Sequence, residues 1–337
     1  MPIANDAPFR LAPFAATAHI GAPPTTLKTM AEAFVLWPAG RGLIRIEGAD
    51  CRAFLQGIVS NDVDKVTPVR AVYAALLTPQ GKYLHDFFIV ELDGALWLDC
   101  EAARRDDLLR RLSRYKLRSR VSLAPGPEGH AVALVYGAGA LPTLGLSSAR
   151  GSAVAFAGGV AYADPRLAEI GARAIFPREK GQAALAAAGA APGEGAEYER
   201  LRLELGLPDG SRDLEIEKSI LLENGFEELG GVDWDKGCYM GQELTARTHY
   251  RALVKKRLLP VRIEGPVPAA GTPVFAGDAE VGVMRSACGG VGLALLKLEA
   301  LSGAAPLTAG DARLEPRKPF WFKPIPESGA AASLRPG

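Results

Sequence analysis

One short run of the sequence, residues 235 to 251, concentrates side chains that can do chemistry. It holds a thiol, two glycines, an amide, carboxylates and two arginines. From Gln242 onward the residues are good helix formers, and three charged residues repeat at i, i+4 spacing: Glu243, Arg247 and Arg251. The run therefore predicts a helix that begins near Gly241, with Cys238 in the turn that leads into its N-terminus.

The surroundings of Cys238 favour a reactive thiol. Free backbone N–H groups and the positive end of the helix dipole lie at such a turn, and Lys236 is two residues away. These features favour the thiolate, which is the nucleophile and the metal ligand. Gly237 and Gly241 flank the turn, where a residue without a Cβ can take a positive φ or admit another group close to the backbone. The alternative is a small buried cysteine in a tight turn.

The same run resembles the signature of the YgfZ family of folate-binding, iron-sulfur-linked proteins. The matching residues are Lys236, Gly237, Cys238, Tyr239, Gly241, Gln242, Glu243, Arg247 and His249. That family is related to the aminomethyltransferase of the glycine cleavage system, and the likeness runs from about Leu43 to about Leu298. The resemblance implies an α+β, aminomethyltransferase-like folate-binding fold with largely antiparallel sheets and a small C-terminal β-barrel.

Two carboxylates become candidate folate contacts through this resemblance. Asp86 is in phase with apolar residues of a strand, so its carboxylate is paired, protonated or faces a cavity, unless that face is exposed. The aminomethyltransferases carry an aspartate at the matching place, which favours a cavity. Glu204 matches the glutamate that holds the pterin ring, since a carboxylate can accept hydrogen bonds from an amino group and a ring N–H together. Without the resemblance, Glu204 would be expected on the surface.

Asn61 and Arg247 complete the expected cofactor contacts. Asn61 lies in a stretch, residues 54 to 63, that is close to a family pattern, although it could equally end the preceding helix. The implied cofactor is tetrahydrofolate or a one-carbon derivative.

The periodicity of apolar residues predicts the elements around these sites. A strand near 42 to 47 and a helix near 51 to 58 precede strands at 71 to 77, 84 to 90 and 95 to 99, a helix at 102 to 117 and a strand near 120. The expected organisation is a disordered extension (1–29), an α+β folate-binding domain (30–120), a second α+β domain that carries the signature and is either separate from the first or interleaved with it (121–251), a β-barrel (252–325) and a loose tail (326–337).

Composition excludes several classes of protein. The formal net charge of +1 gives no overall field for nucleic acid, and no apolar run is long enough to span a bilayer, so direct nucleic-acid binding and a membrane partner are not expected. A basic run from Arg104 to Arg120 is either a solvated helix face or an anion or RNA contact. The four cysteines show no zinc-site spacing, which indicates reduced thiols, no stably bound metal and a cytoplasmic location.

The resemblance implies a tetrahydrofolate-binding accessory factor for iron-sulfur cluster assembly or repair, acting through Cys238. A cluster needs about four protein ligands, so one thiol predicts transient ligation shared with an iron-sulfur carrier or client protein. Two alternatives stay open: a folate-dependent aminomethyltransferase, which would make the protein an enzyme, and an RNA-associated factor that affects tRNA modification.

Overall fold

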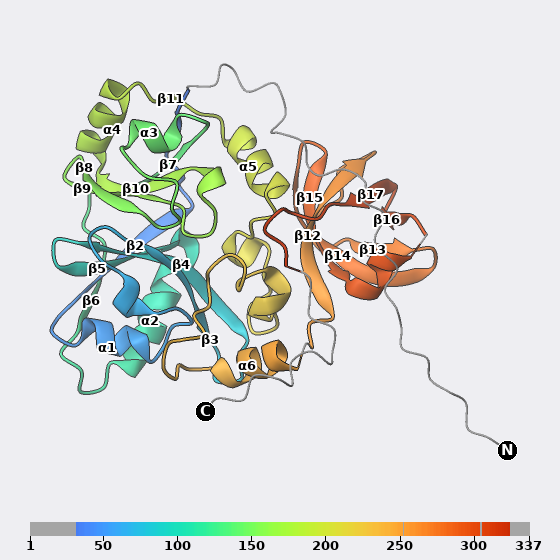
Figure 1. Ribbon diagram of the computed structural model, residues 1–337, viewed down its shortest axis with the longest axis horizontal. Coiled ribbons are helices and arrows are strands. Elements are labelled where there is room, and N and C mark those ends of the chain that lie inside the picture. The colour runs from blue at the N-terminus through green and yellow to red at the C-terminus, as the bar shows by residue number, and fades with distance from the viewer. Residues whose placement is uncertain (1–31, 252, 304, 324–337) are drawn as a thin grey trace.

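The computed structural model describes residues 32–251, 253–303 and 305–323. Two β-sheets lie face to face on one side of the molecule, and a β-barrel lies on the other (Figure 1). The segments expected to be a disordered extension (1–29) and a loose tail (326–337) lie outside the described residues.

The first sheet carries the order of elements expected from the sequence. Its strands are ordered β3-β4-β5-β2-β6, and every neighbouring pair is antiparallel. The elements are β2 (Arg41–Glu47), α1 (Cys51–Gln56), β3 (Val72–Leu77), β4 (Tyr83–Leu92), β5 (Ala95–Glu101), α2 (Arg105–Tyr115) and β6 (Ser122–Pro125). The predicted succession β-α-β-β-β-α-β is confirmed. Both helices pack on one face of this sheet, where their apolar residues join its buried side chains.

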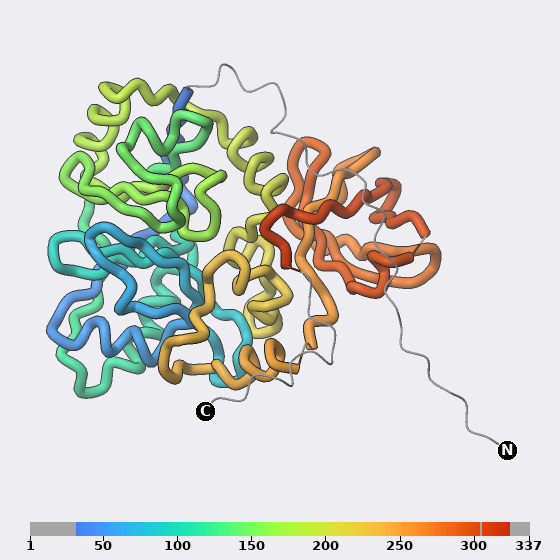
Figure 2. The backbone as a smooth tube through the Cα atoms, in the orientation of Figure 1, coloured from blue at the N-terminus to red at the C-terminus, as the bar shows by residue number. Residues whose placement is uncertain are grey.

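The second sheet is ordered β11-β1-β7-β10-β9-β8 and is antiparallel except where β1 pairs with β11. Its elements are β1 (Phe34–Leu36), β7 (His130–Tyr136), α3 (Ala140–Thr143), β8 (Ala153–Phe156), β9 (Gly159–Ala163), β10 (Ala172–Pro177), α4 (Arg178–Ala187) and β11 (Ala191–Pro192). Thus β1, from the start of the described chain, lies in the second sheet, whereas β6 lies in the first (Figure 2). The chain therefore crosses between the two layers on both sides of the boundary expected near residue 120.

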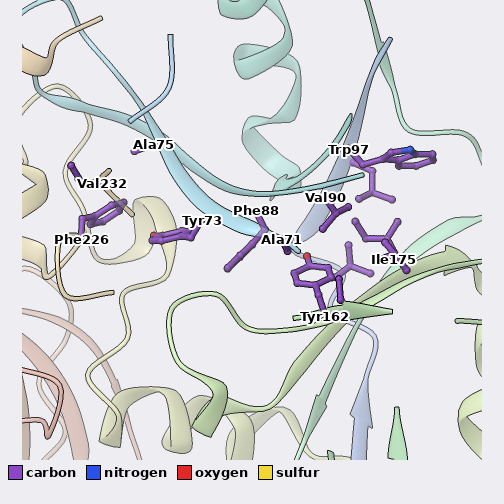
Figure 3. Close-up of a cluster of buried hydrophobic side chains, with 14 of the residues drawn as sticks. Ala71, Tyr73, Ala75, Phe88, Val90, Trp97, Tyr162, Ile175, Phe226 and Val232 are labelled. Carbon is purple, nitrogen blue, oxygen red and sulfur yellow. The ribbon is translucent and has the colours of Figure 1, made fainter. Parts of the chain in front are cut away.

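The largest apolar cluster fills the space between the two sheets (Figure 3). Alternation along the strands explains how each sheet supplies it. In β2, Leu43 belongs to this cluster, whereas Ile44 and Ile46 face α1 and α2. The second sheet supplies Tyr162 and Ile175 from the opposite side. With α3 and α4 on its outer face, the body has four layers: helices, sheet, sheet, helices.

The C-terminal β-barrel is confirmed and is closed. Its order is β12-β15-β14-β13-β16-β17, with the strands β12 (Lys256–Glu264), β13 (Pro273–Ala276), β14 (Ala279–Cys288), β15 (Val291–Lys297), β16 (Leu307–Ala309) and β17 (Ala312–Pro316). The sequence predicted this barrel over residues 252 to 325. The short β16 lies between β13 and β17 and completes the ring.

The segment between the second sheet and the barrel holds α5 (Gly195–Glu204) and α6 (Gln242–Tyr250). Short 3₁₀ helices link the larger elements: η1 (Val63–Lys65), η2 (Ala102–Arg104), η3 (Ala168–Ile170), η4 (Gly210–Arg212), η5 (Leu221–Asn224) and η6 (Leu298–Ser302).

Buried polar contacts tie the segment between the second sheet and the barrel to the barrel itself. Arg257 pairs with Glu228 at 2.6 Å, and the Ser286 N–H donates to Asp213 at 3.0 Å.

Candidate functional site

The predicted signature helix is present as α6, and it begins at Gln242 directly after Gly241. Gly241 has a φ of 81°, in the left-handed region that favours glycine. A Cβ at this position would lie 2.4 Å from the Thr78 carbonyl oxygen and 3.1 Å from the Gly81 Cα. Gly241 is therefore required because the β3–β4 turn packs directly on the entry to α6.

Lys236 anchors the signature to α1. Its Nζ donates to the carbonyl oxygens of Gln56 (2.9 Å), Val59 (2.6 Å) and Asn61 (2.8 Å), at and just beyond the C-terminal end of that helix. Burial lowers the pKa of this ammonium group to about 8. The hydrogen bonds of Lys236 therefore go to the end of α1 rather than to Cys238.

Other signature residues also hold the loop in place. The Tyr239 N–H donates to Oε1 of Gln242 at 2.8 Å, and Tyr239 is buried against the inter-sheet cluster. His249 stacks on Trp234, with ring centroids 4.2 Å apart, and its Nδ1 lies 3.1 Å from a carboxylate oxygen of Glu227. These three side chains are explained by packing and hydrogen bonding within the chain.

Four signature residues instead face solvent: Gly237, Cys238, Glu243 and Arg247. Gly237 has no positive φ, and a Cβ placed on it would meet no atom within 4 Å, which corrects the expectation of a strained or crowded backbone there. Cys238 thus stands on an open surface beside a residue with no side chain. Among the cysteines it is the exposed one, whereas Cys100 is buried and burial raises its pKa to about 12.

Asn61 has a structural role in the described chain. Its amide donates to the carbonyl oxygens of Tyr73 and Gly230, both at 2.7 Å, and its side-chain oxygen accepts from the Asp62 N–H. Arg247, the other expected cofactor contact, is exposed on α6. Asn61 and Arg247 do not line a common cavity in the described residues.

Asp86 is buried and paired between the sheets. Its two carboxylate oxygens accept hydrogen bonds from the hydroxyl groups of Tyr73 and Tyr83, each at 2.7 Å. Burial raises the pKa of Asp86, and the two tyrosine hydroxyls oppose that rise. Leu84, two residues earlier, lies on the opposite side of the strand from Asp86, because the β3–β4 register shifts between Leu76 and Leu77.

Glu204 lies at the end of α5 and pairs with Arg200 one turn earlier, at 2.9 Å. The structure does not bring Glu204 and Asp86 together. Neither residue lines the cavity described next, so the arrangement expected from the aminomethyltransferases is not reproduced at these two positions.

A cavity of about 480 Å³ lies where the β1–β2 loop, the end of β5 and α5 meet. Its wall combines apolar and charged side chains: Leu36, Trp37, Pro38, Gly40, Arg41, Glu101, Ala103, Leu134, Arg166, Arg173, Gly195, Tyr198, Glu199, Arg202, Asp209 and Arg212. Its size and its mixture of apolar walls with a few charged groups are typical of a small-molecule site. It is therefore a candidate site for a small molecule in the described part of the chain.

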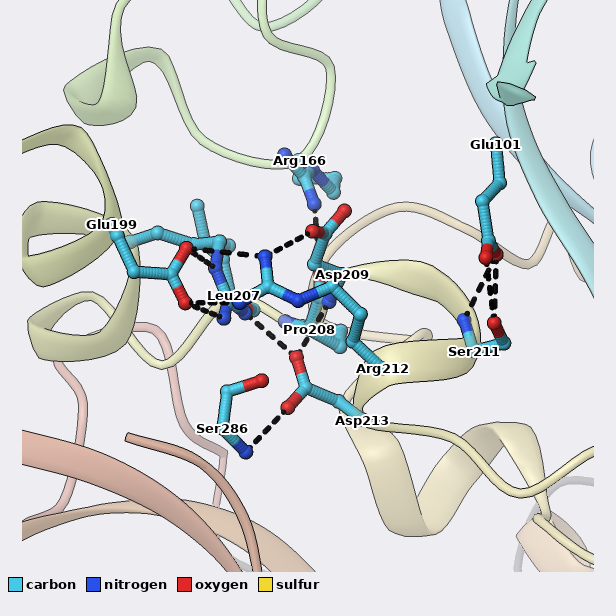
Figure 4. Close-up of polar contacts among 11 residues, drawn as sticks. Glu101, Arg166, Glu199, Leu207, Pro208, Asp209, Ser211, Arg212, Asp213 and Ser286 are labelled. Carbon is cyan, nitrogen blue, oxygen red and sulfur yellow. Dashed lines mark hydrogen bonds and ion pairs between the residues drawn. The ribbon is translucent and has the colours of Figure 1, made fainter. Parts of the chain in front are cut away.

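Ion pairs hold the charged wall of this cavity in place (Figure 4). Arg202 pairs with Asp213 and Glu199, each at 2.7 Å, and Arg212 pairs with Asp209 at 2.9 Å. Burial alone would raise the pKa of Asp209, but nearby guanidinium groups, led by that of Arg202, lower it to about 2. Asp209 is therefore an ionised acceptor on the cavity wall at neutral pH.

This cavity was not predicted from the sequence. One signal for it was available: Arg173 interrupts the apolar strand β10, between Ala172 and Ala174. Arginine is rarely buried without a partner, so it implied an acidic residue elsewhere in the fold. That partner is Asp99, whose Oδ2 accepts from Arg173 at 2.7 Å.

An enclosed metal centre is absent from residues 32–251, 253–303 and 305–323. No group of three or more His, Cys, Asp or Glu side chains in these ranges is placed to hold a metal ion.

Comparison with known proteins now gives the family. A family model described as the GCVT N-terminal domain matches residues 39–151, and one described as the CAF17 C-terminal beta-barrel domain matches residues 255–324. The chain is 34% identical over 297 residues to the iron-sulfur cluster assembly factor IBA57, mitochondrial, of Mus musculus, covering 82% of this chain and 80% of that one. The chain belongs to the IBA57 family. The Homo sapiens protein of the same name is 33% identical over 324 residues, covering 90% of this chain and 88% of that one.

The sequence analysis expected a member of the YgfZ family. The relatives found are IBA57 proteins, and YgfZ is a related family. The fold is also that of a glycine cleavage system aminomethyltransferase T from Bartonella henselae, with a TM-score of 0.69, 15% identity and 84% of each chain covered. The predicted aminomethyltransferase-like fold is thereby confirmed. At this identity the likeness concerns the fold alone.

The expected cytoplasmic location is wrong. The IBA57 relatives from mouse and human are named as mitochondrial proteins. The expectation rested on the absence of a disulfide framework, which indicates reduced thiols but does not select one reducing compartment. In the described part of the chain, no helix combines the length and the apolar character needed to cross a bilayer.

Proposed function

We propose that this IBA57-family protein assists the assembly or repair of iron-sulfur clusters in other proteins, with Cys238 as a transient ligand. Family membership supports the process, because the relatives are named as iron-sulfur cluster assembly factors. The observation that carries the role of Cys238 is its exposure next to Gly237, in a loop that is otherwise firmly anchored. Iron-sulfur carriers and client enzymes are the partners this chemistry requires.

The rigid support of the loop matters for this role. Lys236 fixes one side of Cys238 to α1, and Gly241 fixes the other side to the β3–β4 turn. A thiol held this way loses little conformational freedom when a partner presents a cluster.

The direct test is the activity of cluster-dependent enzymes in cells that lack the protein, measured beside enzymes without a cluster. Equal activity of both groups with and without the protein would contradict the proposal.

The two signature glycines give a prediction that separates folding from partner binding. Gly241→Ala should destabilise the protein by about 1–3 kcal/mol or more, because the new Cβ meets backbone atoms at a left-handed residue. Gly237→Ala should change stability by less than about 0.5 kcal/mol, since its Cβ meets nothing within 4 Å. It should nevertheless reduce rescue of cluster-dependent enzymes. Urea unfolding and rescue assays measure the two effects, and full rescue by Gly237→Ala would show that partners do not approach there.

We further propose that the 480 Å³ cavity binds tetrahydrofolate or a one-carbon derivative. The chemistry of its wall fits a pterin, because the ionised Asp209 can accept hydrogen bonds from an amino group and a ring N–H side by side. Trp37 and Tyr198 supply aromatic surface in the same cavity. When bound, the folate would supply or accept a one-carbon unit, while the protein positions it and excludes water.

The proposed folate contact is Asp209 in place of Asp86 and Glu204, the contacts inferred from the resemblance, and substitution can distinguish them. Asp209→Asn should weaken folate binding by about 1–3 kcal/mol, the range for a lost hydrogen bond to a charged group. Glu204→Gln is the matched control and should leave affinity unchanged, since Glu204 lies outside the cavity. Calorimetry measures both, with melting temperatures as a check on folding. Weaker folate binding by Glu204→Gln but not by Asp209→Asn would contradict this proposal. It would support the contact expected from the aminomethyltransferases.

A further inference from the structure

The C-terminal end of α2 and the turn after it form an unusual projection, which we call the α2 tip and define as residues 114 to 118. It contains three cations, Arg114, Lys116 and Arg118, together with Tyr115 and Leu117. Figure 1 places α2 at the end of the molecule away from the barrel. The cluster and cofactor chemistry proposed above leaves this projection without a role.

Charge is strongly segregated toward this part of the chain. Residues 104 to 120 contain eight Lys or Arg and two Asp, a net of +6, whereas the whole chain carries +1. The remainder of the chain therefore carries a formal net charge of −5. A near-neutral protein thus presents one concentrated basic region, which attracts anionic surfaces locally.

The other cations of residues 104 to 120 form ion pairs within the described residues, but those of the tip do not. Arg111 pairs with Asp107 at 2.8 Å, and Arg120 pairs with Asp50 at 3.1 Å. Within the described residues, the tip cations Arg114, Lys116 and Arg118 form no ion pair. Their charge is available to a partner.

Leu117 gives the tip its second property. Its side chain is 88% exposed, and its backbone has a φ of 42° in the left-handed region, which leucine rarely adopts. Tyr115 beside it is 40% exposed. Leu108, Leu109 and Leu112 of α2 pack in or against the core, whereas Leu117 is not part of that packing.

We propose that the α2 tip docks reversibly on a bilayer surface rich in anionic lipids. Leu117 enters the boundary between headgroups and acyl chains, and the three tip cations lie at the level of the phosphates. Tyr115 has the amphipathic ring that is favoured at this depth. An RNA partner would use the cations and the tyrosine ring but would gain nothing from an exposed aliphatic side chain.

Docking through the tip leaves the signature loop available. Arg120, two residues beyond the tip, pairs with Asp50 at the start of α1, whereas Lys236 binds the signature loop to the end of α1. The two surfaces are therefore at opposite ends of this helix. Such docking needs no bilayer-spanning segment, because the contact is peripheral.

The test uses the full chain in sedimentation with vesicles of phosphatidylcholine alone or with about one third phosphatidylglycerol, and in parallel with a single-stranded RNA oligomer. Binding is expected only to the anionic vesicles and should weaken as salt rises. Replacing Arg114, Lys116 and Arg118 by Gln should weaken it by roughly 100-fold, at roughly fivefold per cation. The matched control replaces three exposed barrel cations by Gln, with the same change in net charge, and should bind normally: Lys256, Arg262 and Arg313.

Leu117→Asn isolates the apolar contribution. Asparagine tolerates a positive φ, so this variant should be at least as stable as the parent, yet it should bind anionic vesicles roughly tenfold more weakly. Absence of vesicle binding, or equal losses in the tip and barrel variants, would overturn the proposal. So would RNA binding that needs the tip cations but is unaffected in Leu117→Asn, since that result assigns the tip to nucleic acid.

Discussion

A Cys238→Ser protein is expected to fold like the parent and yet to fail in restoring cluster-dependent enzymes to cells that lack the protein. Serine is nearly isosteric, and the loop is held by Lys236 and Gly241 rather than by the thiol. The change in stability should be below about 0.5 kcal/mol, because an exposed side chain away from packing contributes little. A hydroxyl, however, does not replace a thiolate as a ligand for iron.

The matched control for this experiment is Cys288→Ser, which removes a thiol from the barrel strand β14. It should rescue the enzymes fully. Alkylation of the folded protein adds a chemical check: Cys238 should react first, whereas Cys100 should stay protected by burial until unfolding. Full rescue by Cys238→Ser would leave the signature thiol as a surface residue without a chemical role.

Asp99→Ala is expected to give the largest loss of stability. Asp99 is fully buried between the sheets and accepts hydrogen bonds from Arg41 at 2.7 Å and from Arg173 at 2.7 Å. Removing the carboxylate leaves two guanidinium groups in the interior without this counter-charge. Breaking a buried pair in this way typically costs about 3–5 kcal/mol.

The loss should appear as a lower urea midpoint, followed by circular dichroism. Asp106→Ala is the matched control, because Asp106 pairs with Arg105 on the surface and its side chain is 81% exposed. An exposed pair contributes less than about 1 kcal/mol, so this midpoint should move little. Equal midpoints for the two variants would show that the buried network is replaceable. The same network lines the proposed folate cavity, so Asp99→Ala should also impair folate binding.

Much of the fold could be predicted from the chain because it is encoded locally. The alternation in β2, the helical spacing that places Phe54 and Leu55 in the core and the glycine-punctuated barrel strands are patterns within a few residues. The start of α6 after Gly241 was equally local, since a left-handed glycine and good helix formers are adjacent in sequence. The exposed Cys238 and its motif could be named for the same reason.

Predictions from the sequence were wrong or incomplete where a side chain's partner is distant along the chain. Lys236 is two residues from Cys238, but its ammonium group binds carbonyl oxygens up to 180 residues away, at Gln56. The sequence left the direction of Asp86 open and the resemblance favoured a cavity, but neither could show that Tyr73 and Tyr83 would satisfy the buried carboxylate. A register shift between β3 and β4 also moved Leu84 to the opposite side, which strict alternation cannot anticipate.

The sequence by itself determined the order of elements, the barrel, the signature loop and its thiol, because backbone preferences and apolar periodicity act between near neighbours. Only the tertiary structure decided which charges neutralise one another and where a cavity remains. Arg173 and Asp99 are 74 residues apart, and the cavity wall draws on β1, β5, β7 and α5. Such pairings depend on how sheets and helices stack, because a buried charge is stabilised only by the partner that packing brings within hydrogen-bond distance.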